Sequence, residues 1–345
     1  MARRLLLLVT VLLLGTTLAP AYAAGSGYAP LHRKGPALSV PKAALRAALT
    51  CHGNPKAGPE PVLLNPATSV TPEQNYSWNY EKAFTAQGRY WCAVTMPFHT
   101  FGDIQTAGEY LVHAIRVMHR RTGRSIAILG HSQGGMSMRW ALRFWPGTRA
   151  MVADVIGMAG DNHGTTALLG CVKGVTTCTP AVWQQLRDSA FIKALNSRAE
   201  TFAGISYTEI YTHTDEVVTP SGSATTASSA LHTGKGRITN VATQDVCPLE
   251  VYEHLLTGTV SATTYALVMD ALDHAGPAEP DRIPRSVCGQ LYMPGINSLT
   301  LATYTPMLSA LPSLASTELP LVTLSGAPML KAEPPLRCYA LKKGC

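Results

Sequence analysis

The residues best suited to chemistry surround Ser132, in the pentapeptide Gly130-His131-Ser132-Gln133-Gly134. A strand-like apolar run precedes this pentapeptide, and residues 136–145 after it have the apolar spacing of an amphipathic helix. This arrangement is typical of a nucleophile elbow, a strained turn that exposes the serine hydroxyl beside the free N–H groups of a helix start. We therefore predict that Ser132 is a catalytic nucleophile.

A serine hydroxyl needs a base that takes its proton and an acid that orients the base. When an elbow serine lies on an α/β sheet, the acid and then the histidine follow it along the chain. Asp215 comes directly after an expected strand, at the sheet edge where such loops gather, and is the favoured acid. Asp161, which also follows a strand, and the neighbouring Glu216 remain alternatives.

Three histidines follow Asp215 in the chain: His232, His254 and His274. We favour His254 as the base, because it comes about ten residues after the last expected strand, in what we expect to be a loop anchored by a cysteine. His274 lies beyond a helix and stays open as the second choice. For the oxyanion, the backbone N–H of Gln133 is the expected first donor. Thr68, in the loop after an early strand, is the expected second donor.

The elements that must position these residues alternate between strands and helices. Apolar runs predict strands at 61–64, 90–96, before the elbow, and at 152–158, 205–211 and 237–242. Apolar spacing predicts helices over 105–121, 136–145, 182–195 and 259–272, and a short one over 41–49 within a surface arm at 24–50. The order predicts a single α/β domain over 24–345, with a mostly parallel central sheet and flanking helices.

Both ends of the chain differ in composition from this domain. Two arginines, an apolar run and Ala21-Tyr22-Ala23 predict a signal peptide over 1–23, so we expect an exported protein without a transmembrane span. Eight cysteines fit an oxidising compartment, and no paired spacing suggests a metal, so neither metal nor cofactor is expected. The formal charge of +7 falls to +5 without Arg3 and Arg4, which does not suggest nucleic-acid binding.

Two further segments are expected to cover the domain. Residues 164–198 interrupt the strand pattern and are expected to lie over the end of the sheet as a cover or lid. Glu318 is the only charged residue from Ser286 to Leu330, where repeated prolines exclude a helix of spanning length. We expect the C-terminal part, about 289–345, to pack on the domain as an apolar flap.

The chain resembles the family of Candida antarctica lipase B in stretches spread along the sequence in the same order. They are residues 48–51, 61–64, 132–135, 181–185, 214–218 and 247–249, with resemblance from about Pro41 to Cys288 and more loosely to Cys345. The resemblance implies an α/β-hydrolase fold, with Ser132, Asp215 and His254 as catalytic residues and Thr68 and Gln133 as oxyanion donors. It implies a substrate pocket that includes His131, Asp161 and Val217.

The resemblance also implies disulfides between Cys51 and Cys92 and between Cys247 and Cys288, with Cys338 and Cys345 as a C-terminal pair. Cys171 and Cys178 then remain as the fourth disulfide pair. Three features depart from the family. Ala67 and Ser69 replace glycines beside the oxyanion threonine, His131 replaces a tryptophan before the nucleophile, and Cys171 with Cys178 would restrain the small lid.

We therefore expect a secreted, monomeric serine hydrolase that acts on a lipid or other carboxylic ester, including at a lipid-water interface, through an acyl-enzyme. A polyester depolymerase or an acyltransferase with the same catalytic residues is the alternative within the enzymes. Outside them, the alternative is a secreted binding protein without activity.

Overall fold

Seven strands form one sheet in the computed structural model, which describes residues 27–167, 170–308 and 325–345. The sheet order is β1-β3-β2-β4-β5-β6-β7, and every neighbouring pair is parallel except β1 with β3. The strands are β1 (Leu49–His52), β2 (Val62–Asn65), β3 (Trp91–Val94), β4 (Ile126–His131), β5 (Val152–Met158), β6 (Ser206–Tyr211) and β7 (Arg237–Ala242). The predicted α/β fold with a mostly parallel sheet is confirmed. The expected signal peptide, 1–23, lies outside the described residues.

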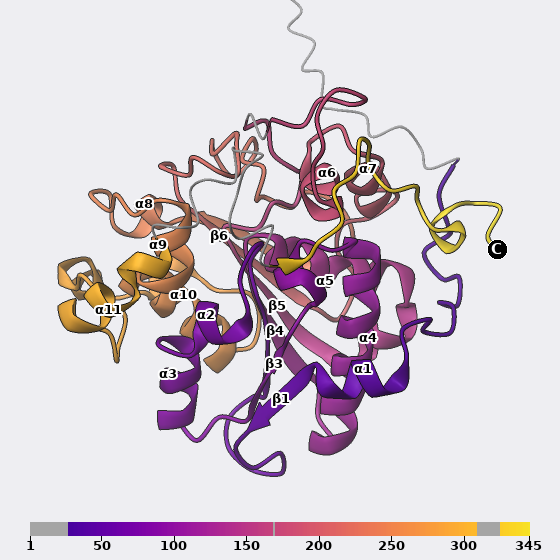
Figure 1. The fold of residues 1–345 in the computed structure, drawn as a ribbon. Helices are drawn as coiled ribbons and strands as arrows, with labels where there is room; N and C mark the ends of the chain where they lie inside the picture. The colour runs from indigo at the N-terminus through magenta and orange to yellow at the C-terminus, as the bar shows by residue number, and fades with distance from the viewer. Residues whose placement is uncertain (1–26, 168–169, 309–324) are drawn as a thin grey trace, which may run out of the picture.

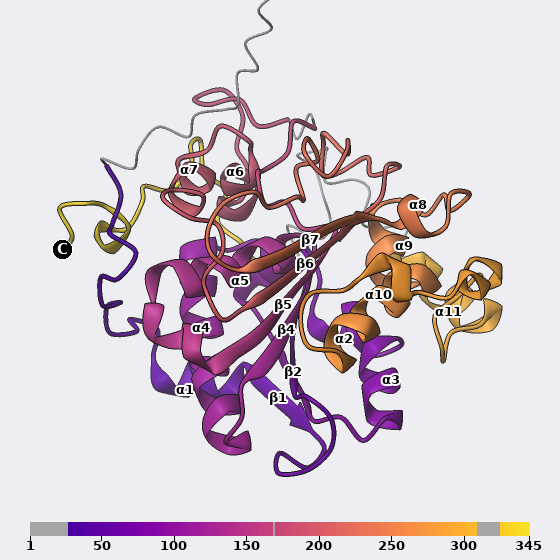
Figure 2. The same cartoon turned by 180° about the vertical axis from the view of Figure 1, so that it is seen from behind.

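Helices cover both faces of the sheet (Figures 1 and 2). The α-helices are α1 (Lys42–Ala47), α2 (Pro72–Tyr76), α3 (Tyr80–Ala86), α4 (Ile104–Thr122), α5 (Gln133–Phe144), α6 (Pro180–Gln185), α7 (Ala190–Leu195), α8 (Thr243–Val246), α9 (His254–Thr259), α10 (Ala262–Asp273) and α11 (Ser298–Leu308). Successive strand residues alternate between the two faces. Leu63 and Ile128 pack in the core under α4 and α5, whereas Leu64 and Leu129 pack in the core under α3 and α10.

None of the helices in the described residues combines the length and the apolar character needed to cross a lipid bilayer.

The structure differs from the predicted elements at several points. The single helix predicted over 182–195 is wrong: α6 ends at Gln185, Leu186 is extended, and Ser189 caps the separate helix α7 by accepting a hydrogen bond from the N–H of Ile192. The helix expected over 41–49 ends at Ala47, and the next residues form β1. The sequence analysis also missed α2, α3 and α9, which have five, seven and six residues.

Four disulfides join the eight cysteines in the expected pairs: Cys51–Cys92, Cys171–Cys178, Cys247–Cys288 and Cys338–Cys345. Cys51–Cys92 links directly opposed residues of β1 and β3, and so fixes the antiparallel edge strand to the sheet.

The described parts of the expected C-terminal flap lie in two separate places (Figure 1). Tyr304 of α11 stacks on Trp78, with 4.9 Å between ring centroids, beside α2 and α3. The final residues lie across the molecule, where the N–H of Ala29 donates to the carbonyl of Ala340. The remainder of the flap, 309–324, lies outside the described residues. The described C-terminal part therefore covers two regions rather than one.

Candidate active site

Ser132 occupies the sharp turn between β4 and α5. Its backbone angles, φ 54° and ψ −126°, lie in a region that residues with a Cβ rarely adopt, as expected for an elbow. The N–H of Ser132 donates to the carbonyl of Met158 at 2.9 Å, and the Ser132 carbonyl accepts from Gly135 at 2.8 Å. These bonds hold the strained residue between β5 and the first turn of α5.

Two glycines make this turn sterically possible. A Cβ at Gly130 would lie 2.3 Å from the backbone of Gly134. A Cβ at Gly134 would lie 2.1 Å from the carbonyl oxygen of Asn65 at the end of β2. The Asn65 side chain in turn donates to the Gly134 carbonyl at 2.7 Å and to the Ser137 hydroxyl at 2.9 Å. The elbow is thus packed directly against the neighbouring strand.

Asp215 and His254 form a buried pair at the same carboxyl edge of the sheet. His254 Nδ1 lies 2.9 Å from Asp215 Oδ2, and the two residues are 7% and 5% exposed. Asp215 Oδ1 accepts hydrogen bonds from the N–H groups of Val217 and Val218, at 2.9 and 2.7 Å. These contacts fix the carboxylate, which orients the imidazole. His254 is the first residue of α9 and not part of a loop, so a short helix positions the ring.

The surroundings of His254 favour its protonated form. Burial alone would lower its pKa, but the charge of Asp215 and the hydrogen bond to it outweigh burial. Glu216 and Glu253 add smaller contributions, and the net result is a pKa raised above the ordinary value for histidine. An imidazole in this setting can accept a proton and is then stabilised as imidazolium.

The two expected oxyanion donors lie together beside the elbow. The Thr68 hydroxyl donates to Gln185 Oε1 and accepts from Gln133 Nε2, both at 3.1 Å. Gln133 opens α5, where first-turn amides have no partner within their helix. Its side chain also donates to the Thr100 carbonyl at 3.1 Å. The Thr68 hydroxyl would have to turn from Gln185 before it could donate to another oxygen.

A small cavity joins several of these residues. Its described lining consists of Thr68, Ser132, Asp161, Thr165, Val182, Gln185, Val217 and Val218. Asp161 is 1% exposed, and its Oδ1 has no hydrogen-bond partner within the described residues. Burial raises the pKa of Asp161 well above its ordinary value, and the charge of Asp215 adds to this against the opposing effect of His254. Burial therefore favours the neutral form of this carboxyl group, which can donate a hydrogen bond.

The alternative base, His274, lies at the other end of the sheet. It contributes to a pocket with Glu60, Arg124 and Asp154, around the starts of β2, β4 and β5. Its Nδ1 is 3.0 Å from the Asp270 carbonyl, and its side chain is 52% exposed. Ser132 follows the last residue of β4, so Ser132 and His274 lie at opposite ends of the parallel strands.

Comparisons with known proteins agree with this fold. The family model for lipase (class 2) matches residues 109–264, which include Ser132, Asp215 and His254. Lipase B of Pseudozyma antarctica is 36% identical over 223 residues, which is 64% of each chain. The crystal structure of Aspergillus fumigatus lipase B is similar with a TM-score of 0.75 and 29% identity, over 89% of this chain and 74% of that chain.

The chain has the α/β-hydrolase fold and is similar to lipase B proteins. The aligned region spans a little under two thirds of the Pseudozyma antarctica relative, 64% of its length.

His131, which was predicted to lie in the substrate pocket, packs beside His254. Its ring is 1% exposed and is not among the described residues that line the cavity. It packs behind His254, with 5.4 Å between the ring centroids, and its Nε2 is 3.2 Å from the His254 carbonyl. Burial, followed by the neighbouring His254, lowers the pKa of His131 to about 3. His131 is thus a buried, neutral contact of His254, and its place in a substrate pocket stays a prediction.

Sequence reasoning missed two side chains that support the site. Gln185 accepts the hydrogen bond of the Thr68 hydroxyl, and the sequence signal for it was the polar pair Gln184-Gln185 after three apolar residues. Asn75 accepts a hydrogen bond from the Ala67 N–H at 2.9 Å and approaches His131 Nδ1 at 3.4 Å. No local pattern distinguishes Asn75, because α2 brings it into the site only in the folded chain.

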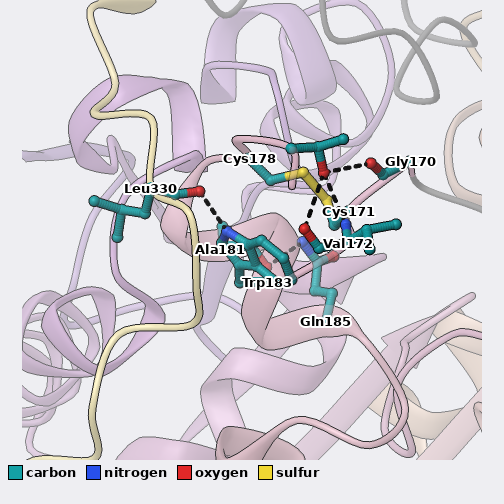
Figure 3. The surroundings of a disulfide bond; sticks show 9 residues. Gly170, Cys171, Val172, Cys178, Ala181, Trp183, Gln185 and Leu330 are labelled. Carbon is teal, nitrogen blue, oxygen red and sulfur yellow. Dashed lines mark hydrogen bonds between the residues drawn. A yellow bond between two sulfur atoms is a disulfide. The ribbon is translucent and has the colours of Figure 1, made fainter. Parts of the chain in front are cut away.

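The segment 164–198, the expected cover, is fastened at two points, which Figure 3 shows. The Cys171–Cys178 disulfide closes a loop in which the Thr176 hydroxyl donates to the Gly170 carbonyl at 2.8 Å. Cys178 and Leu330 exchange two backbone hydrogen bonds, at 2.9 and 2.8 Å. Trp183 Nε1 also donates to the Leu330 carbonyl at 2.8 Å. The described C-terminal segment therefore contacts both the disulfide loop and α6 of the expected cover.

Proposed function

We propose that this protein is a secreted serine hydrolase that cleaves carboxylic esters of lipids through an acyl-enzyme. The observation that carries the proposal is the strained Ser132 at the same sheet edge as the buried Asp215–His254 pair. The lipase relatives support the same activity. The apolar side chains Val182, Val217 and Val218 in the cavity lining suit an acyl group.

In the proposed reaction, the Ser132 Oγ attacks the ester carbonyl carbon while His254 Nε2 takes the hydroxyl proton. The negative charge on the carbonyl oxygen is stabilised by the amides of Thr68 and Gln133 and by the Thr68 hydroxyl. The bond to the alcohol oxygen then breaks, and His254 returns the proton to the leaving alcohol. Water then attacks the acyl carbonyl carbon while His254 takes its proton. The bond to Ser132 Oγ breaks, His254 returns the proton to Ser132, and the carboxylic acid is released.

Asp161 has a separate proposed role. Its neutral carboxyl lies in the same cavity as Ser132, so its O–H can donate to an ester or alcohol oxygen of the bound substrate. We place it as a substrate-binding group, alongside Val217.

We propose export for this chain because four disulfides join its eight cysteines, and such pairs persist in oxidising compartments. The proposed signal peptide, residues 1–23, would direct it there. The proposed mature protein is one domain of residues 24–345, whose cover spans about 164–198.

The test is ester hydrolysis by the purified mature protein on emulsified triacylglycerol and on soluble p-nitrophenyl esters. Activity that Ser132→Ala abolishes supports the proposal. His254→Ala should lower kcat by at least about a thousandfold, whereas the matched change His274→Ala should leave it within a factor of two. An activity that survives Ser132→Ala, or that His274→Ala abolishes, contradicts the proposed machinery.

A further inference from the structure

A groove of about 800 Å³ lies on the flank of the domain, between α1 and α4. Its lining comes from the segment before α1, from α1 and the start of β1, and from the second half of α4: Ala37, Leu38, Val40, Lys42, Leu45, Arg46, Leu49, His113, Arg116, Val117, Arg120 and Arg121. Figure 1 shows α1 and α4 adjacent to one another on this side of the sheet. The volume falls in the range of small-molecule sites.

All of the charged side chains that line this groove are cationic, so we call it the basic groove. Five lining side chains are cationic, Lys42, Arg46, Arg116, Arg120 and Arg121, and no lining residue is acidic. Within the described part of the chain, none of the five cations has a carboxylate at ion-pair distance. Their charges are therefore not neutralised by neighbouring side chains.

The four arginines are near enough to His113 to lower its pKa. Burial lowers its pKa first, and Arg120, Arg46, Arg116 and Arg121 each lower it further. The pKa of Arg116 is itself lowered, by burial and then by the charge of Arg120. Four arginines from two helices thus repel positive charge at one point and would attract an anion there.

The remainder of the groove is apolar. Leu38, Val40 and Leu49 are partly buried and pack against the main hydrophobic cluster, to which the buried Leu45 belongs. Val117 of α4 adds a further apolar side chain between the arginines. An anion without a hydrocarbon part, such as phosphate, would leave this surface in contact with water. A neutral lipid would leave the arginines without a partner.

We propose that this groove binds a free long-chain fatty carboxylate, with the carboxylate at the arginines and the hydrocarbon chain along the leucine and valine side chains. Guanidinium groups pair with carboxylates through two parallel hydrogen bonds, which favours this head group. The groove contains none of the candidate catalytic residues, so the proposal goes beyond the proposed function and does not depend on it.

Isothermal titration of monomeric dodecanoate into the full mature Ser132→Ala protein at pH 8 tests the proposal. We expect one bound dodecanoate per chain, and no comparable binding of acetate or of dodecyltrimethylammonium. The double variant Arg116→Gln/Arg120→Gln should weaken binding at least tenfold. The matched control Lys82→Gln/Lys235→Gln removes two exposed cations elsewhere and should leave the dissociation constant within a factor of two.

Three results would overturn the proposal. Equal dodecanoate affinity in the two double variants would show that dodecanoate binds at another site, such as the cavity beside Ser132. Equal binding of dodecyltrimethylammonium would remove the role of the arginines. Binding to phosphatidylglycerol vesicles without binding of monomeric dodecanoate would identify a lipid surface as the partner. The melting temperature of each variant checks that it is folded, so that weakened binding reports the groove.

Discussion

Ser69 adopts a backbone conformation that favours glycine, one residue after the proposed oxyanion donor. Its φ is 69°, whereas Ala67 is not among the residues with positive φ. Ser69 is 1% exposed, and its hydroxyl has no hydrogen-bond partner within the described residues. The side chain therefore adds both backbone strain and a buried polar group to the loop that carries Thr68.

Ser69→Gly should raise the free energy of unfolding by about 1 kcal/mol, because glycine adopts positive φ without strain. Urea denaturation measures this change. Ser77→Gly is the control, since Ser77 has φ −63° and glycine should lower stability there. A loss of stability in Ser69→Gly would contradict the assignment of strain to this residue.

The Asp215–His254 pair makes a prediction about pH. The neutral imidazole is the proposed base, so kcat/KM should fall as pH falls through the raised pKa of His254. Asp215→Asn removes the charge that raises this pKa. The acid limb of the profile should therefore move to lower pH, and kcat should fall by about 10⁴.

The measurement is the pH dependence of p-nitrophenyl ester hydrolysis by the wild type and by Asp215→Asn. An acid limb that stays at the same pH in the variant would mean that another group controls it.

Among the elements, the turn from β4 to α5 leaves no space for a side chain at Gly134. Gly134→Ala would place a Cβ against the Asn65 carbonyl oxygen, and neither backbone can move without disturbing the sheet. We expect a loss of about 3 kcal/mol of stability and a strong loss of activity. Gly147→Ala is the matched control, because no atom lies within 4 Å of the Cβ position there.

Thermal denaturation and ester hydrolysis of the two alanine variants measure these effects. A fully stable and active Gly134→Ala protein would show that β2 and α5 are less closely packed than the structure has them.

Apolar patterning predicted the long elements and missed several short helices. Val152–Met158 and Arg237–Ala242 were predicted with their observed bounds, because each is a compact run between turn signals. The helix over 182–195 was mispredicted because the extended Leu186, which separates α6 from α7, fits the apolar spacing of a continuous helix. α2 and α9 have no more than two turns each and bury too few apolar residues to give a periodic pattern.

The same limit applies to the site. Ser132 was predicted from its local sequence, and Asp215 from its place after a strand. His254 was preferred over His274 by its position in the chain, and His131 was placed in the substrate pocket by resemblance alone. The contact of His131 with His254 depends on α9 folding across β4, which no local sequence pattern indicates.

For the whole molecule, three acidic side chains link stability to pH. Burial is the main cause that raises the pKa of Glu60 and of Glu209 to about 8 and of Asp154 to about 7. The folded chain then binds more protons than the unfolded chain between the ordinary carboxyl pKa and these values. Stability must therefore fall as pH rises through this range.

We expect the free energy of unfolding to fall by roughly 2 kcal/mol from pH 6.5 to 8.5, a window above the range in which His131 changes its charge on unfolding. Urea denaturation across this range measures the slope, and Glu209→Gln should reduce it. A stability that rises over the same window would show that these acids are ionised in the folded protein.

The central claim is that Ser132 is an activated nucleophile served by Asp215 and His254. The most direct measurement is labelling of the mature protein with an alkyl phosphonate ester, followed by mass spectrometry of its peptides. We predict one adduct, on Ser132, formed much more slowly in the folded His254→Ala variant and at the normal rate in His274→Ala. An adduct on another residue, or equal rates of labelling in wild type and His254→Ala, would contradict the account.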